Sequence, residues 1–218
     1  MADARLNEIF GQNLRNYRES LGQSRQIFSA AFNGSPYTLQ SYELGHQCPN
    51  LKRFLNLCNT FQISPNLLLD SLFPWRTEMD EVRDLAALAD GLYGQNAQKL
   101  VEFQDIYIRD TVETRPWMMG APLGIRIHVL RMESGMNIDT LAKLCMVSRA
   151  TMQGYESSQY DPTLPAVLHL CEAFHISPEY LLAPFLQKLS YPDARIADLR
   201  PRQIKTLLEL SRYMRNNL

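Results

Sequence analysis

The stretch LNLCNTFQISPNLLL at residues 55–69 recurs as LHLCEAFHISPEYLL at residues 168–182. The two stretches belong to a longer repeat, because an offset of 113 positions aligns residues 11–69 with residues 124–182 without a gap. The 59 aligned columns contain 19 identities, far more than the handful that chance would give. A repeat at a fixed offset indicates that one structural unit is built twice. The sequence therefore predicts two copies of one fold.

Helix-start signals divide each copy into short helices. Ser64–Pro65 and Ser177–Pro178 place a capping hydroxyl before a proline that suits the first helical position. The sequence has no convincing alternating run of β-branched residues, so the predicted fold class is all-α. The predicted helices cover residues 7–20, 24–32, 36–44, 51–61 and 65–70 in the first copy, and 124–134, 138–145, 149–157, 164–174 and 178–183 in the second.

A weaker match extends the repeat beyond each copy. At an offset of 107 positions, LVEF at residues 100–103 faces LLEL at residues 207–210. We therefore expect one additional helix after each copy, near residues 96–110 and near residues 203–216. The expected organisation is a first domain at residues 1–73, a helical linker at 74–122, a second domain at 123–183 and a C-terminal helix at 184–218.

Composition restricts the classes of function. The 218 residues, 45% of them hydrophobic, are enough for two small globular domains. No apolar run approaches the roughly 20 residues of a membrane helix, and the N-terminus lacks a signal peptide, so we expect a cytoplasmic protein without membrane contact. The four cysteines form no CxxC pair, and the four histidines lie outside any catalytic motif. We expect free thiols, no metal, no cofactor and no enzymatic activity.

The segment between the second and third predicted helices has the length of a helix-turn-helix. The first copy reads YRESLGQSRQIFSAAFNGSPYTLQSYELG from residue 17, and the second reads LRMESGMNIDTLAKLCMVSRATMQGYE from residue 130. Links of about three residues, NGS and MVS, separate the two helices. Each copy resembles the lambda-repressor/Cro-like (XRE-type) helix-turn-helix family. The resemblance implies two five-helix domains in tandem, with the third helix of each in the DNA major groove.

The resemblance also implies which side chains meet DNA. The base-reading candidates are Tyr37, Gln40 and Ser41 in the first copy, beside Pro36, and Arg149 and Gln153 in the second copy, beside Ala150 and Gly154. Arg149 is chemically the best reader, because a guanidinium can bond guanine through two hydrogen bonds. The phosphate candidates are Arg25, Lys52 and Arg53, all in the first copy. Ile138 occupies the position of Arg25 in the second copy and cannot contact phosphate.

Two charge pairs recur at the same spacing. Arg18 precedes Glu43 by 25 residues, and Arg131 precedes Glu156 by 25 residues. The resemblance implies that each pair joins the first helix of its copy to the third. We therefore expect these four residues to stabilise the fold rather than to read DNA.

The resemblance implies a bacterial or phage-type transcriptional regulator, repressor-like, that binds double-stranded DNA with two heads and performs no catalysis. The charge leaves an alternative open, because the second copy is net negative and has Ser157–Ser158 where the family has glycine. The alternative is a protein-interaction module of the same fold, such as an antirepressor or an antitoxin. The additional helices predict an intramolecular pseudo-dimer or a homodimer contact, unless each merely closes its own domain.

Overall fold

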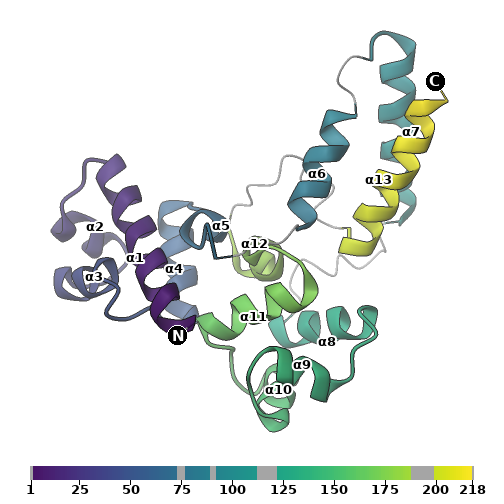
Figure 1. Ribbon diagram of the computed structural model, residues 1–218. Coiled ribbons are helices and arrows are strands. Elements are labelled where there is room, and N and C mark those ends of the chain that lie inside the picture. Colours follow the sequence, from purple (N-terminus) through teal and green to yellow (C-terminus); the bar gives the residue numbers. More distant parts are fainter. Residues whose placement is uncertain (1, 73–76, 89–91, 112–121, 188–198, 218) are drawn as a thin grey trace.

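The computed structural model describes residues 2–72, 77–88, 92–111, 122–187 and 199–217, which form helices and no strand (Figure 1). The first head, as we call it, consists of α1 (Ala2–Ser20), α2 (Arg25–Ala31), α3 (Pro36–Glu43), α4 (Leu51–Phe61) and α5 (Pro65–Leu68). The second head consists of α8 (Leu123–Glu133), α9 (Ile138–Leu144), α10 (Arg149–Glu156), α11 (Leu164–Phe174) and α12 (Pro178–Leu182), followed by the short 3-10 helix η1 (Ala183–Phe185). The predicted all-α fold is confirmed, and α9–α12 each begin 113 positions after α2–α5.

Side-chain caps start the helices at equivalent positions in the two heads. Ser35 accepts a hydrogen bond from the amide of Thr38, and Ser148 accepts one from the amide of Thr151. The other capped starts are those of α2, α4, α5, α9, α11 and α12, at Ser24, Asn50, Ser64, Asn137, Thr163 and Ser177. Each cap satisfies an amide that the helix itself leaves unpaired. The local sequence therefore determines where these capped helices begin.

A glycine in the first helix of each head lets the third helix approach closely. A Cβ atom added to Gly11 would lie 2.2 Å from the carbonyl oxygen of Tyr42, and one added to Gly124 would lie 2.3 Å from that of Tyr155. A real side chain cannot occupy that space, so only glycine allows this helix packing. The contact positions α3 and α10 against the core of their heads.

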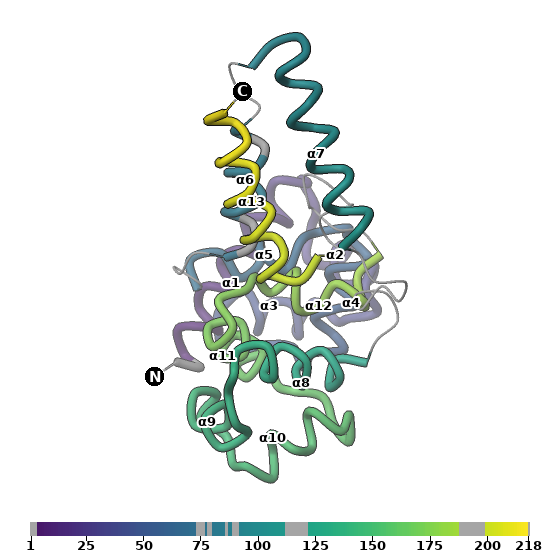
Figure 2. The backbone as a smooth tube through the Cα atoms, turned by 90° about the vertical axis from the view of Figure 1, so that its right-hand side faces the viewer, coloured from purple at the N-terminus to yellow at the C-terminus, as the bar shows by residue number. Residues whose placement is uncertain are grey.

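A helical arm, which we define as α6 (Glu78–Ala87), α7 (Gln95–Thr111) and α13 (Pro201–Asn216), packs around a core of its own (Figures 1 and 2). Its buried residues are Val82, Leu85, Ile108, Leu199, Ile204, Leu207 and Leu208. Arg212 donates a hydrogen bond to Asp84 at 2.8 Å, joining α13 to α6. The additional helices predicted near residues 96–110 and 203–216 are therefore present as α7 and α13, and they pack on one another. The sequence did not single out α6.

The two heads also contact each other directly, through α5 against α12 and α1 against α11. Their buried side chains form one continuous cluster that includes Leu51 and Leu164. The sequence had suggested a connection through the additional helices alone. The direct contact was missed because it depends on how two folded surfaces meet.

The described helices are too short or too polar to span a membrane. All four cysteines are free thiols: Cys58, Cys145 and Cys171 are buried, and Cys48 is half-buried. Burial raises the pKa of the Cys145 thiol to about 12. In the described residues, no group of His, Cys, Asp and Glu side chains is arranged to hold a metal ion.

Candidate DNA-binding surface

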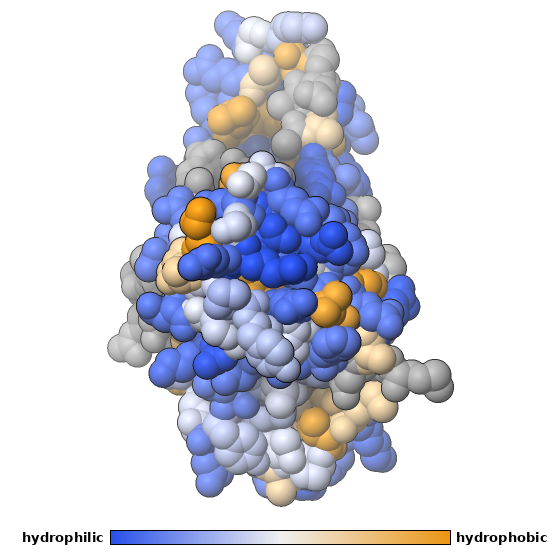
Figure 3. Space-filling model, turned by 90° about the vertical axis from the view of Figure 1, so that its left-hand side faces the viewer, coloured by the Kyte–Doolittle hydropathy of each residue, from blue (hydrophilic) through white to orange (hydrophobic). Residues whose placement is uncertain are grey.

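The third helix of the first head, α3, has one buried face and one open face. Leu39 and Tyr42 are buried against the rest of the head. On the opposite face Tyr37 is 81% exposed, Gln40 is exposed and Ser41 is half-buried. Figure 3 looks onto this side of the molecule and shows a mainly hydrophilic surface with separate hydrophobic spots. The open face of α3 therefore presents hydroxyl, amide and aromatic groups to solvent.

The third helix of the second head, α10, exposes Arg149 and Gln153. Arg149 Nη1 donates a hydrogen bond to Asp139 Oδ2 at 2.7 Å, and both side chains are about half exposed. An exposed ion pair of this kind contributes about 1 kcal/mol or less, so Arg149 can exchange Asp139 for another acceptor. Asp139 lies in the first turn of α9 and places a negative charge beside the Arg149 guanidinium. No sequence pattern indicated this pair.

Gly154, expected to face the bases beside Arg149 and Gln153, is covered by another side chain. It is buried, and a Cβ atom added to it would lie 2.2 Å from the ring of Tyr160. The Tyr160 hydroxyl donates a hydrogen bond to the carbonyl oxygen of Ala150 at 3.3 Å. The expectation that Gly154 faces bases is therefore wrong. Tyr160, which is 44% exposed, occupies that side of α10.

In the first head, Glu43 joins three helices. Arg18 Nε lies 2.5 Å from Glu43 Oε1, and Arg18 Nη2 lies 3.3 Å from Oε2. The Glu43 side chain is fully buried. Arg25 Nε donates to Glu43 Oε2 at 2.6 Å, so the residue predicted to contact phosphate is a second cation on this carboxylate. The distance in sequence between Arg25 and Glu43 gave no sign of this contact.

The equivalent carboxylate of the second head is Glu156. Arg131 Nε and Nη2 donate to its two oxygens at 2.5 and 2.9 Å, and His128 Nδ1 lies 2.9 Å from Oε2. Burial raises the pKa of the Glu156 carboxyl, but hydrogen bonds from Arg131 and His128 outweigh that effect and leave the pKa below its ordinary value. The His128 contact was not anticipated.

The remaining phosphate candidates, Lys52 and Arg53, lie in the first turn of α4 and are exposed. Their counterparts in the second head are Pro165 and Ala166, which carry no charge. Phosphate contacts supply most of the affinity for DNA that does not depend on sequence. Cations at this helix start are therefore a property of the first head alone.

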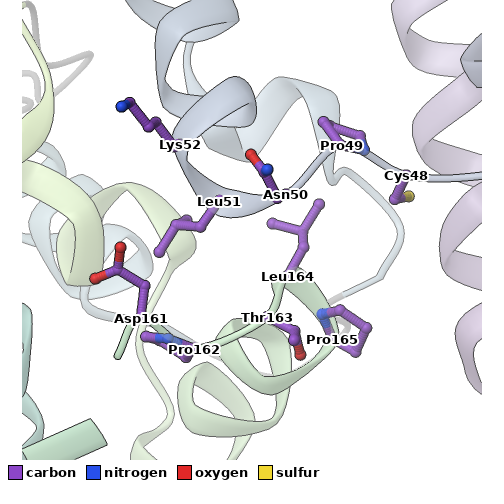
Figure 4. A pocket seen from close by; sticks show the side chains of 10 residues that line it. All are labelled: Cys48, Pro49, Asn50, Leu51, Lys52, Asp161, Pro162, Thr163, Leu164 and Pro165. Atoms are coloured by element: carbon purple, nitrogen blue, oxygen red, sulfur yellow. The ribbon is translucent and has the colours of Figure 1, made fainter. Parts of the chain in front are cut away.

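A pocket of about 460 Å³ lies where the two heads meet. Its lining is Cys48, Pro49, Asn50, Leu51 and Lys52 from one head, and Asp161, Pro162, Thr163, Leu164 and Pro165 from the other. Each residue of the second set follows its counterpart by 113 positions. Figure 4 shows the two segments on opposite sides of the pocket. The equivalent segments that precede and begin α4 and α11 therefore face each other across the pocket.

Comparison with known proteins finds a family match for the second head. The family described as "Helix-turn-helix domain" matches residues 122–183. No curated protein and no solved structure matches the chain. The first head lies outside the matched residues, so the comparison supports one helix-turn-helix domain and does not extend to two tandem XRE-type copies. A helix-turn-helix domain is a DNA-binding fold. Residues 122–183 are therefore similar to a helix-turn-helix domain of the DNA-binding kind.

Proposed function

We propose that this protein is a sequence-specific, repressor-like transcriptional regulator that binds double-stranded DNA with two heads and performs no catalysis. The match of residues 122–183 to a helix-turn-helix domain carries this proposal. The exposed Arg149 and Gln153 on α10 support it, because guanidinium and amide groups can each form two hydrogen bonds with a base.

The first head is proposed as the second DNA-binding unit. Its α2–α5 begin at positions equivalent to those of α9–α12, and its α1 packs on α3 through Gly11 as α8 packs on α10 through Gly124. On this basis residues 1–73 and 123–183 are two XRE-type domains, with residues 74–122 and 184–218 contributing the helical arm.

The two heads contribute different contacts to DNA. Lys52 and Arg53 supply cations for phosphates in the first head, where Tyr37, Gln40 and Ser41 face the bases. The second head supplies Arg149 as its chief reader and holds Asp139 close to it. Asp139→Asn should therefore strengthen DNA binding, because it removes a negative charge that DNA phosphates repel.

Selection of duplexes from a random pool tests the proposal. The full chain should enrich a defined sequence, and Arg149→Ala and Tyr37→Ala should each lose preference at separate base positions. Loss of one good bidentate contact corresponds to about 1–3 kcal/mol of discrimination. Lys205→Ala is the matched control, because Lys205 is exposed on α13 of the helical arm, and its selected sequence should equal that of the unchanged chain. Failure to enrich any sequence at low salt would contradict the proposal.

A second candidate function rests on apolar side chains that the second head exposes. Met146 is 76% exposed, Met132 is 59% exposed and Leu144 is 49% exposed. Their counterparts in the first head are Asn33, Glu19 and Ala31. Such residues suit a protein-interaction module of the antirepressor or antitoxin kind. Duplex affinity no better than random, with tight binding of a protein partner that Met146→Asp abolishes, would favour this candidate.

A further inference from the structure

We infer that the two heads form a rigid pseudo-dimer within one chain, so that a single molecule occupies a complete DNA site with two unlike half-sites at a fixed spacing. The inference rests on the proposed function for its DNA partner. The contact between α5 and α12 sets the spacing.

One part of the interface, α5 against α12, joins equivalent surfaces of the two heads, whereas the contact of α1 with α11 joins helices that are not equivalent. Ser64 on the first head donates a hydrogen bond to the Glu179 carboxylate, and the Glu179 amide donates to Asn66 Oδ1 at 2.9 Å. Asn66 and Glu179 are themselves equivalent, 113 positions apart. The pocket between the heads is lined by five residues of one head and their five counterparts. Contact between equivalent patches is typical of a two-fold dimer, and this part of the interface resembles that relationship within one chain.

Both third helices lie away from the helical arm. In Figure 1, α3 lies at the left and α10 at the bottom, while the helical arm extends to the upper right from the region of α5 and α12. The arm therefore leaves α3 and α10 uncovered. Helix-turn-helix dimers use such a pair of helices to enter two major grooves about 34 Å apart, one turn of the double helix.

Further hydrogen bonds fix the heads against one another. Asn59 on α4 donates to the carbonyl oxygen of Phe185 at 2.8 Å and accepts from the amide of Gln187 at 2.9 Å. This two-way contact holds the chain after α12 against the first head. Glu179 is fully buried, so its carboxylate depends on the groups that the interface brings to it. Rotation of one head would break these contacts together.

The half-sites are unlike because the reading faces differ. The first head begins α3 with Pro36 and Tyr37, whereas the second head begins α10 with Arg149 and Ala150. A homodimer of one head would require a palindrome, since both halves would read the same bases. One chain with two different heads reads two different half-sites.

Spacing variants of the selected duplex test the pseudo-dimer. The full chain should bind the duplex one to one. Insertion of about 5 base pairs, or of about 10 base pairs, between the half-sites should each weaken binding by about 100-fold, because the second head then loses its half-site. Asn59→Ala should tolerate the insertions better than the unchanged chain. Asn16→Ala, an exposed substitution on α1, is the control and should remain as sensitive as the unchanged chain. Two chains per duplex, or full affinity after an insertion, would overturn the inference.

A measurement of the distance between spin labels on the two heads tests, without DNA, whether the heads are fixed relative to one another. Ala30→Cys and Lys143→Cys place spin labels at equivalent exposed positions, in a Cys48→Ser background because the other thiols are buried. A single narrow distance distribution is expected, and a broad distribution overturns the pseudo-dimer. If no duplex is enriched while the distribution is narrow, the proposed function fails and the fixed arrangement of the heads stands.

Discussion

Arg18 Nε lies 2.5 Å from Glu43 Oε1, and Arg131 Nε lies 2.5 Å from Glu156 Oε1, with the partners of each pair 25 positions apart in the sequence. Each pair joins the first helix of its head to the end of the third. The two pairs therefore hold α3 and α10, the helices with the DNA-facing candidates, in the same position within their heads.

Glu43→Ala should lower the free energy of unfolding by about 3–5 kcal/mol, because it leaves the nearly buried Arg18 without its carboxylate. Chemical denaturation followed by circular dichroism measures the change. Asp110→Ala is the control, because Asp110 pairs with Arg109 on the exposed surface of α7, and it should leave the stability nearly unchanged. An unchanged midpoint for Glu43→Ala would refute the structural role of the pair.

Gly11→Ala should destabilise the first head by about 1–3 kcal/mol, because the added methyl group meets the Tyr42 carbonyl oxygen. Gly124→Ala should act in the same direction in the second head. Gln12→Ala, at the exposed neighbouring position of α1, is the control. Thermal unfolding measures all three, and equal melting temperatures for Gly11→Ala and Gln12→Ala would contradict the close approach of α1 and α3.

A fall in pH should destabilise the second head, because it protonates the Glu156 carboxylate. The pKa of this carboxyl is lower in the folded chain than its ordinary value of 4.5. A carboxyl whose pKa is lowered by folding stabilises the folded chain at pH values above its pKa in the unfolded chain. This stabilisation is lost as the pH falls through its pKa in the folded chain. The free energy of unfolding, followed from about pH 6 to about pH 3, should therefore fall less steeply in Glu156→Gln than in the unchanged chain. Equal slopes for Glu156→Gln and the unchanged chain would contradict a stabilising role of this carboxylate.

Ser158→Gly should stabilise the second head by roughly 1 kcal/mol, because Ser158 adopts a φ of 58°, where side chains are strained. The first head has Gly45 at this position, with a φ of 70°. Gly45→Ser is the reciprocal variant and should destabilise. A loss of stability in Ser158→Gly would show that contacts of the serine side chain outweigh the backbone strain.

The helices could be predicted from the sequence because their determinants are local. Ser35 and Ser148 cap the third helices through amides only three residues away. The Arg18–Glu43 pair could be predicted because the same spacing recurs in the second copy and the family resemblance implies the contact. Other features depend on tertiary placement: Asp139 meets Arg149 from another helix, and Tyr160 folds back over Gly154. The contact of Ser64 with Glu179 spans 115 residues and has no local signal at all.

The affinity of the full chain for its selected duplex, measured against a scrambled duplex over a series of salt concentrations, tests DNA recognition most directly. The proposed regulator should bind the selected duplex about 10³-fold or more tightly than the scrambled one. Its affinity should fall steeply as salt rises, because cations such as Lys52 and Arg53 displace counterions from phosphates. Equal and weak affinity for the two duplexes at low salt would contradict sequence-specific DNA binding by this chain.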